Sequence, residues 1–393
     1  MAESPMKHMT QPVITLFAYP FRIFFLSLAL WAVVIVVLWV ALITGHAGLP
    51  LAWAPMMWHQ HEMLFGLLSA GIAGFLLTAV CVWTQTERLQ GAGLLALWLV
   101  WGLGRLLATL GASVPEVMVV AANLLFLPLV MLDAGWRIWR ARQRRQLIVL
   151  MVVALLWSMQ AGFLLLGPAR FAEAALLTAV LLMLVIGGRI TPAFSGNWLR
   201  MRGGAAERVR TLPALEVATL ASSALLVPAV LLGLPAMALA LLAFVAAITS
   251  GVRLLLWRGW LVGAEPLLWI LHLSLLWVPV ALLLLAGAAL GLWPATVWLH
   301  AAGVGAMGGL ILGVISRVSL GHTGRPLVLP PGMVPAFVIL HLGAAIRVLA
   351  ALSVLPWKAG ILLSGACWVV AFLFFIWRYA GILARPRADG RPG

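Results

Sequence analysis

The sequence is short of charge. Only 9% of its 393 residues are Asp, Glu, Lys or Arg, and just 10 are acidic. Its two cysteines, Cys81 and Cys367, lie far apart in apolar segments, which excludes a CxxC motif and a disulfide framework. No chain of Asp and Glu residues runs through the apolar segments, so the relay acids of a proton pump are missing. Apolar residues make up 64% of the sequence, and the mean hydropathy of +1.13 excludes an ordinary soluble domain.

Long apolar runs predict an all-α fold, a polytopic transmembrane bundle of about 12 helices. Each run is long enough, at about 1.5 Å per residue, to cross roughly 30 Å of hydrocarbon. The expected spans are approximately 23–43, 62–83, 94–111, 116–135, 147–166, 172–190, 212–232, 236–256, 267–289, 296–317, 335–354 and 360–382.

The basic residues orient this bundle. If the N-terminus is cytoplasmic, 21 of the 25 basic residues fall in inner segments, which is the asymmetry of the positive-inside rule. We therefore expect both termini in the cytoplasm and a location in the bacterial inner membrane. The net charge of +15 is spread over separate inner loops that face anionic lipid, so the bilayer is the expected partner and nucleic acid is not.

We expect one integral-membrane domain over residues 1–393. Its longest polar stretch, the predicted cytoplasmic loop at about 191–211, separates six helices (about 23–190) from six more (about 212–382). Such a division is typical of transporter repeats. The halves show no convincing similarity, however, because the histidine-rich second helix has no counterpart in the eighth.

The second apolar run opens on Trp58-His59-Gln60-His61-Glu62. Ionisable groups at membrane depth are expensive and usually functional, and imidazole is a ligand for iron, copper and zinc. His59 and His61 therefore suggest a metal or haem site, and Glu62 is the candidate catalytic residue. If a redox reaction there consumes protons, we expect them to enter from the periplasmic side near Glu62. In a regular helix the two histidines point to nearly opposite sides, so they share one metal only if residues 58–61 are non-helical. The alternative is a solvated helix start.

The tenth helix supports a haem site from another direction. His300 lies near its outer end, where it could meet His59 and His61, and Gly303 clears space three residues later. A flat macrocycle or a neighbouring helix would use that space. The stripe of Gly305, Gly309 and Gly313 is also typical of close helix packing.

A second set of residues is expected near the inner face. His272 lies in helix nine, His322 lies in a Gly-rich loop, and His341 is interpreted as a packing residue. Two predicted inner loops, 188–197 and 317–326, offer glycine amides and arginines to an anion such as a haem propionate or a lipid phosphate. The arginines are Arg189, Arg317 and Arg325. Basic turns placed by topology alone are the alternative.

Arg105 and Arg347 are predicted within spans, where a charge requires a partner or water. Acids at that depth are few, so a propionate or another bound anion is the expected partner of at least one of these arginines. Arg105 could instead reach the outer interface.

The sequence resembles the NnrS family along nearly its whole length. The matching segments are 19–25, 58–66, 74–80, 104–105, 187–192, 271–272, 299–300, 317–326 and 347–348. One departure is Cys81-Val82-Trp83-Thr84-Gln85, which lacks the Asn before Trp83 and the Gly after Thr84 that the family pattern has. A polar contact there is in doubt.

The resemblance implies a twelve-helix inner-membrane protein of the nitrosative-stress and denitrification response that holds copper and haem, expected to be of the b type. It does not assign individual histidines to either metal. Three functions stay open: a haem–metal oxidoreductase acting on nitric oxide or a nitrosylated species, a non-catalytic binding or sensing protein, and a transporter of an anionic substrate. An oxidoreductase would take electrons from a quinol or a cytochrome, because no electron-entry module is evident.

Overall fold

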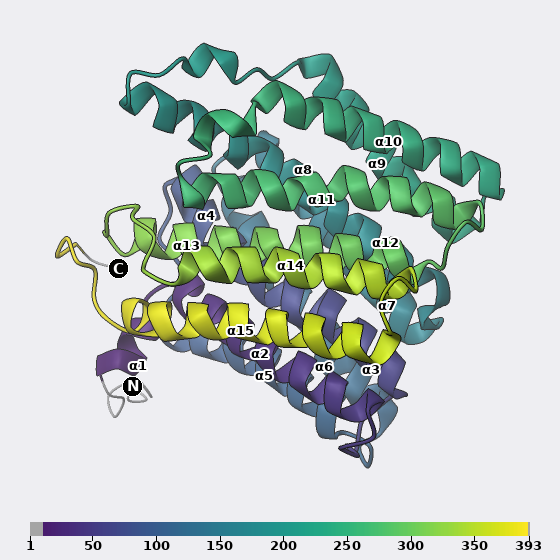
Figure 1. Ribbon diagram of the computed structural model, residues 1–393. Coiled ribbons are helices and arrows are strands. Elements are labelled where there is room, and N and C mark those ends of the chain that lie inside the picture. Colours follow the sequence, from purple (N-terminus) through teal and green to yellow (C-terminus); the bar gives the residue numbers. More distant parts are fainter. Residues whose placement is uncertain (1–10, 392–393) are drawn as a thin grey trace. The chain divides into compact units, whose positions relative to one another are not determined.

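The computed structural model describes residues 11–391, which form helices joined by turns and loops and contain no strand. It confirms twelve helices long and apolar enough to cross a membrane (Figure 1), so the chain is a multi-pass membrane protein. A short helix α1 (Gln11–Leu16) precedes them. The spans are α2 (Pro20–Ile43), α3–η2–α4 (Pro55–Thr84), α5 (Gly91–Leu110), α6 (Glu116–Arg140), η3–α7 (Arg144–Leu165), α8 (Pro168–Met201), α9 (Pro213–Leu232), α10 (Ala236–Trp257), α11 (Pro266–Ala289), α12–η6–α13 (Thr296–His322), α14 (Met333–Ala351) and α15 (Trp357–Leu383).

Two spans contain a π-helical segment, a wider helix in which each N–H bonds five residues back. One is η2 (Glu62–Leu67), between α3 (Pro55–His61) and α4 (Leu68–Thr84). The other is η6 (Ala301–Gly308), between α12 (Thr296–His300) and α13 (Gly309–His322). Each segment begins directly after a histidine.

The predicted inner loop at 188–197 is wrong, because α8 continues through it to Met201. Pro192 and the polar residues around it suggested a helix end. The continuation is stabilised by burial: Leu199 packs with Val262 and Leu268, and Phe194 and Trp198 cover them. Arg189 therefore lies on a helix. The first part of the other predicted loop is also helical, since α13 reaches His322 and includes Arg317, whereas Arg325 does lie in a loop.

The described chain forms two compact units. Unit 1 comprises residues 11–168, 315–330 and 372–391, and unit 2 comprises 169–314 and 331–371. The boundary near Pro168 follows the fifth span, not the polar stretch after the sixth. Helices α13 and α15 each supply residues to both units.

Within unit 1, α2 packs against α4, and α6 packs against α4, α5 and α7. Arg22 in the first turn of α2 is fully buried, and its Nη1 donates to the carbonyls of Leu383 (2.6 Å) and Arg385 (2.8 Å). These carbonyls are available because they lie at and just beyond the end of α15. The first span is thereby joined to the chain that follows the last one.

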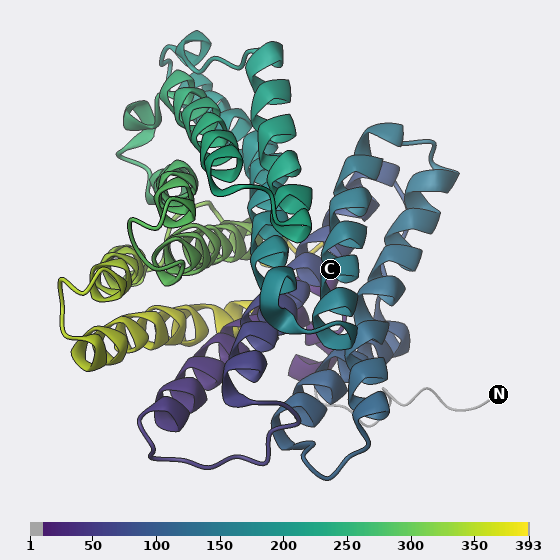
Figure 2. The same ribbon diagram turned by 90° about the vertical axis from the view of Figure 1, so that its right-hand side faces the viewer.

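Within unit 2, α10 packs against both α9 and α11, as the 90° views also show (Figures 1 and 2). Arg253 of α10 is buried and forms a two-pronged ion pair with Glu216 of α9. Gly188 leaves the room that this guanidinium occupies, since any side chain there would overlap it.

Candidate functional site

The histidine-rich motif is helical from Pro55 to His61, so its two imidazoles separate. The His59 ring stacks on Trp39 of α2, with ring centroids 4.2 Å apart and planes 9° apart. His61 is fully buried among Trp53, Phe65 and Phe163. Because residues two apart on a helix face different ways, the two histidines serve different partners and do not meet at one metal here.

Glu62, the next residue, is also fully buried. Its Oε1 lies 2.8 Å from His61 Nδ1, and its Oε2 accepts a hydrogen bond of 3.0 Å from the Trp31 indole. Arg105 Nε forms an ion pair with the same Oε2 at 2.9 Å. These contacts compensate the buried carboxylate. They favour a role for Glu62 in positioning His61 and Arg105.

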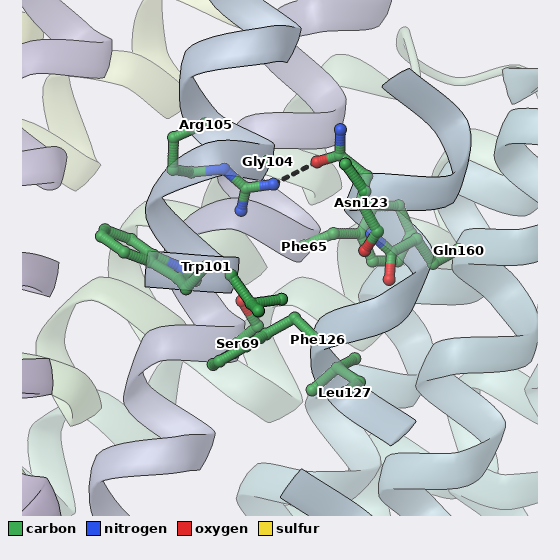
Figure 3. A pocket seen from close by; sticks show the side chains of 11 residues that line it. Phe65, Ser69, Trp101, Gly104, Arg105, Asn123, Phe126, Leu127 and Gln160 are labelled. Atoms are coloured by element: carbon green, nitrogen blue, oxygen red, sulfur yellow. Dashed lines mark hydrogen bonds between the residues drawn. The ribbon is translucent and has the colours of Figure 1, made fainter. Parts of the chain in front are cut away.

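Arg105 is 5% exposed and does not reach an open interface. Its Nη2 donates a hydrogen bond to Asn123 Oδ1 (Figure 3). The packing depends on Gly66, where a Cβ would overlap the Glu62 carboxylate and lie 2.9 Å from Arg105 Nη1. Since Arg105 has protein partners, its predicted contact with a propionate has no support from this geometry and stays a prediction.

Gln160 of α7 completes the network on the far side of His61. Its Nε2 lies 3.2 Å from His61 Nε2 and donates to the Asn123 carbonyl at 3.1 Å. Glu62 only accepts, so Nδ1 of His61 carries the proton, and Nε2 accepts from the amide. Gln160 Oε1 is buried and finds no hydrogen-bond partner among residues 11–391.

A small polar cavity adjoins these groups (Figure 3). Its volume is about 10 Å³, and its polar lining comes from Ser69, Trp101, Arg105, Asn123 and Gln160. That is about the space that one water molecule needs, so this cavity is too small for a haem. The role of His61 in binding haem stays a prediction.

A second constellation lies in unit 2. His300 ends α12, and its Nδ1 lies 2.7 Å from the Thr296 carbonyl. Nδ1 is therefore the protonated nitrogen, which leaves the Nε2 lone pair for another partner. A Cβ at Gly303 would meet nothing within 4 Å, so the expected space after His300 is present.

Arg347 of α14 lies close enough to His300 to interact with it electrostatically. It is half-buried, and the described part of the chain offers its guanidinium neither a hydrogen bond nor an ion pair. It lines a cavity of about 600 Å³ together with Thr296, Ser353 and Trp357. A cation without a partner beside a cavity of this size is suited to an anionic ligand.

His272, His322 and His341 each have a packing partner, and the assignment of His272 and His322 to a cofactor stays a prediction. His272 Nε2 lies 2.9 Å from Ser195 Oγ, and its ring packs on Gly259. His322 packs its ring on Phe21. His341 accepts a hydrogen bond of 3.1 Å from the Trp277 indole.

The predicted metal residues do not form a cluster. His61 belongs to unit 1 and His300 to unit 2. Residues 11–391 contain no group of three or more His, Cys, Asp or Glu side chains able to hold a metal ion. The assignment of His59, His61 and His300 to a metal therefore stays a prediction.

Three kinds of residue in this network were not predicted from the sequence: Asn123, Gln160 and the tryptophans that contact the buried charges. The signal was present, because Asn123 and Gln160 are isolated polar residues within long apolar runs. They meet the same criterion of cost at membrane depth that singled out the ionisable residues.

The comparison with protein families gives a match to the family described as NnrS protein, over residues 15–387. No curated protein matches the chain. The family match covers every span and both constellations. The chain therefore belongs to the NnrS family.

Proposed function

We propose that this membrane protein of the nitric oxide response binds haem in unit 2, and that the haem iron receives nitric oxide. The observation that carries the proposal is the Arg347 guanidinium, which lacks a partner among the described residues and lines a cavity of about 600 Å³. Cofactor pockets of about 300–1,000 Å³ are usual. The NnrS match over residues 15–387 supports the link to nitric oxide.

The residues around this cavity suit a haem. Thr296 and Arg347 line it, whereas His300 is not a lining residue. The Thr296 carbonyl fixes the His300 ring and leaves its Nε2 lone pair available, and buried haem iron commonly takes an imidazole ligand. Arg347 is a two-pronged donor for a propionate. When bound, the haem would supply an iron centre that takes up nitric oxide. His300 would orient that centre, and Arg347 would balance its anionic edge.

The described chain offers copper no group of three or more His, Cys, Asp or Glu side chains. Glu62 orients His61 in the way that carboxylates orient metal-bound histidines. His61 Nε2, however, faces the Gln160 amide, and the other histidine of the motif stacks on Trp39. Copper binding remains an expectation from the family resemblance.

The test uses the purified full-length protein, produced with an ample haem supply. We expect a Soret band, a shift of that band on anaerobic addition of nitric oxide, and a more than tenfold loss of bound haem in His300→Ala. Arg347→Leu should lose haem or shift its reduction potential more than Arg347→Lys, which keeps the charge without the planar fork. His272→Ala, which alters a packing histidine of the same unit, is the control.

Two results would contradict the proposal. One is a folded wild-type protein without haem. The other is full haem with an unchanged potential in both His300→Ala and Arg347→Leu. Steady consumption of nitric oxide with a reduced quinol would add turnover to binding, and its absence would identify a binding protein.

A further inference from the structure

A second large cavity lies at the turn between α6 and α7 and is open on one side. The cavity has a volume of about 630 Å³ and is lined by Ile138, Trp139, Arg140, Arg142, Arg144 and Leu147. Half of these residues are arginines, and none is acidic. All six belong to unit 1 and come from one hairpin, so the site is built locally.

The charge in this cavity is not balanced by the protein. Arg137, one turn earlier, forms hydrogen bonds of 2.9 Å to both oxygens of Asp133. The three arginines that line the cavity form no ion pair with any carboxylate of residues 11–391. Three like charges around one space repel one another, and a bound anion would remove that repulsion.

The backbone fixes where these arginines lie. The Arg142 N–H donates to the Trp139 carbonyl (3.1 Å), and the Gln143 N–H donates to Ile138 (3.0 Å). Arg142 adopts a φ of 55°, the left-handed conformation that costs a residue with a side chain roughly 1–2 kcal/mol. The turn is therefore a defined structure that holds two arginines on either side of Gln143.

The other residues that line the cavity, Ile138, Trp139 and Leu147, are apolar. The Trp139 side chain is 69% exposed, and its ring lies 5.2 Å from that of Trp136, which is also exposed. Tryptophan at the end of a membrane span is typical of the headgroup region. The cavity thus lies at the junction of two spans, and its lining includes three arginines and one member of an exposed tryptophan pair.

We propose that this cavity binds a phosphate group, and that the phosphate belongs to the headgroup of an anionic lipid. Arginine forks match phosphate oxygens in pairs. The exposed Trp139 and Leu147 would contact the acyl region of the same lipid. Free phosphate could bind the same arginines but would not contact the apolar lining residues.

The experiment measures lipid retained by the purified full-length protein. The protein is exchanged into micelles that contain phosphatidylglycerol or phosphatidylcholine, and bound lipid is counted by native mass spectrometry. We expect the wild type to retain phosphatidylglycerol and not phosphatidylcholine. Replacing Arg140, Arg142 and Arg144 by Gln should lower that retention at least tenfold, whereas Arg208→Gln, which removes an exposed arginine of another loop, should leave it unchanged.

Inorganic phosphate separates the two sources of the anion. No displacement of the lipid by millimolar phosphate supports the lipid headgroup, and full displacement by phosphate overturns it in favour of a soluble ligand. Equal retention by the wild type and the triple variant would overturn the site itself. Arg142→Gln and Arg144→Gln as single variants, with thermal unfolding measured for each, keep the test decisive if the triple variant does not fold.

Discussion

The pair formed by Glu62 and Arg105 is the most deeply buried ion pair in the described chain, with side chains 0% and 6% exposed. Removing one member of such a pair leaves a buried charge without its partner. We predict that Glu62→Leu or Arg105→Leu lowers the free energy of unfolding by about 3–5 kcal/mol. The double variant should lose less than the sum of the two. Thermal unfolding in detergent measures all three.

The pair of Asp133 and Arg137, with side chains 23% and 16% exposed, is the less buried comparison. A partly exposed i,i+4 pair leaves its surviving member in contact with water when the partner is removed, so Asp133→Asn should have a smaller effect in the same assay. Strictly additive losses at Glu62 and Arg105 would show that the two side chains act independently.

Asp389 gives a prediction about pH. Arg387 donates to its carboxylate and lowers the pKa of Asp389 from its ordinary value of 3.8 to about 2. A lowered pKa means that the charged form stabilises the folded tail above pH 4, and that this stabilisation is lost as the pH falls through about 2. The tail is bound through the Ala388 N–H, which donates to the Thr323 carbonyl at 3.0 Å.

We therefore expect the Ala388 amide to exchange its hydrogen more slowly than the same amide in an unstructured peptide. The ratio of these two rates should not change between pH 4 and pH 7. Asp389→Asn should speed this exchange at neutral pH, and Arg391→Gln should not. If the Ala388 exchange rate, again relative to an unstructured peptide, rises steadily from pH 7 to pH 4, Asp389 is not the controlling group.

At the level of elements, the two π-helical segments are the least predictable feature. Both follow a histidine, His61 or His300. The span that follows each of them carries a buried or half-buried arginine, Arg105 or Arg347. The histidine-rich second helix has no counterpart in the eighth helix, but the tenth helix shares this arrangement. Hydrophobic periodicity did not reveal it, because a single widened turn hardly changes an apolar pattern.

Gly66 lies within η2, the first π-helical segment, and replacing it tests how closely that segment is packed. We predict that Gly66→Ala lowers the unfolding free energy by about 1–3 kcal/mol, the usual cost of overpacking, because the new methyl group would overlap the Glu62 carboxylate. Gly102→Ala in α5 is the control. Its Cβ would meet nothing within 4 Å, so it should be neutral or stabilising by roughly 0.5–1 kcal/mol. Equal melting temperatures for Gly66→Ala and the wild type would contradict the close packing.

Element ends could be predicted only where polarity changes sharply. The existence of all twelve spans follows from apolar length. The sixth span was predicted to end at about residue 190, whereas α8 continues to Met201. Burial of Leu199 against Val262 and Leu268 outweighs Pro192 there. Such contacts join residues about 60 positions apart, so local composition does not contain them.

At the scale of the whole molecule, the charge asymmetry gives a topological prediction. Reporter fusions after residues 145 and 205 should be active in the cytoplasm, and fusions near residues 48 and 292 should be active in the periplasm. Alkaline phosphatase and green fluorescent protein report opposite sides and serve as mutual controls. Inverted signals at all four points would reverse the orientation.

The sequence could predict the class of the molecule and several residues at its buried charges, but not which of them meet. His59, His61 and His300 were grouped by their common depth. The structure separates the first two by helix geometry and places the third in another unit. Depth is a one-dimensional coordinate, whereas a ligand set is fixed by neighbours in the plane of the membrane, and one sequence carries no measure of those neighbours.

The buried Arg22 has a consequence for biosynthesis. Its acceptors, the carbonyls of Leu383 and Arg385, are made 361 and 363 residues later. At roughly 5–20 residues per second, the ribosome needs on the order of 20–70 seconds to supply them. During that interval the first span lies in the bilayer with an arginine that has not reached its final acceptors, so a chaperone, lipid or water must solvate it. A chain truncated before residue 383 would never acquire these two acceptors.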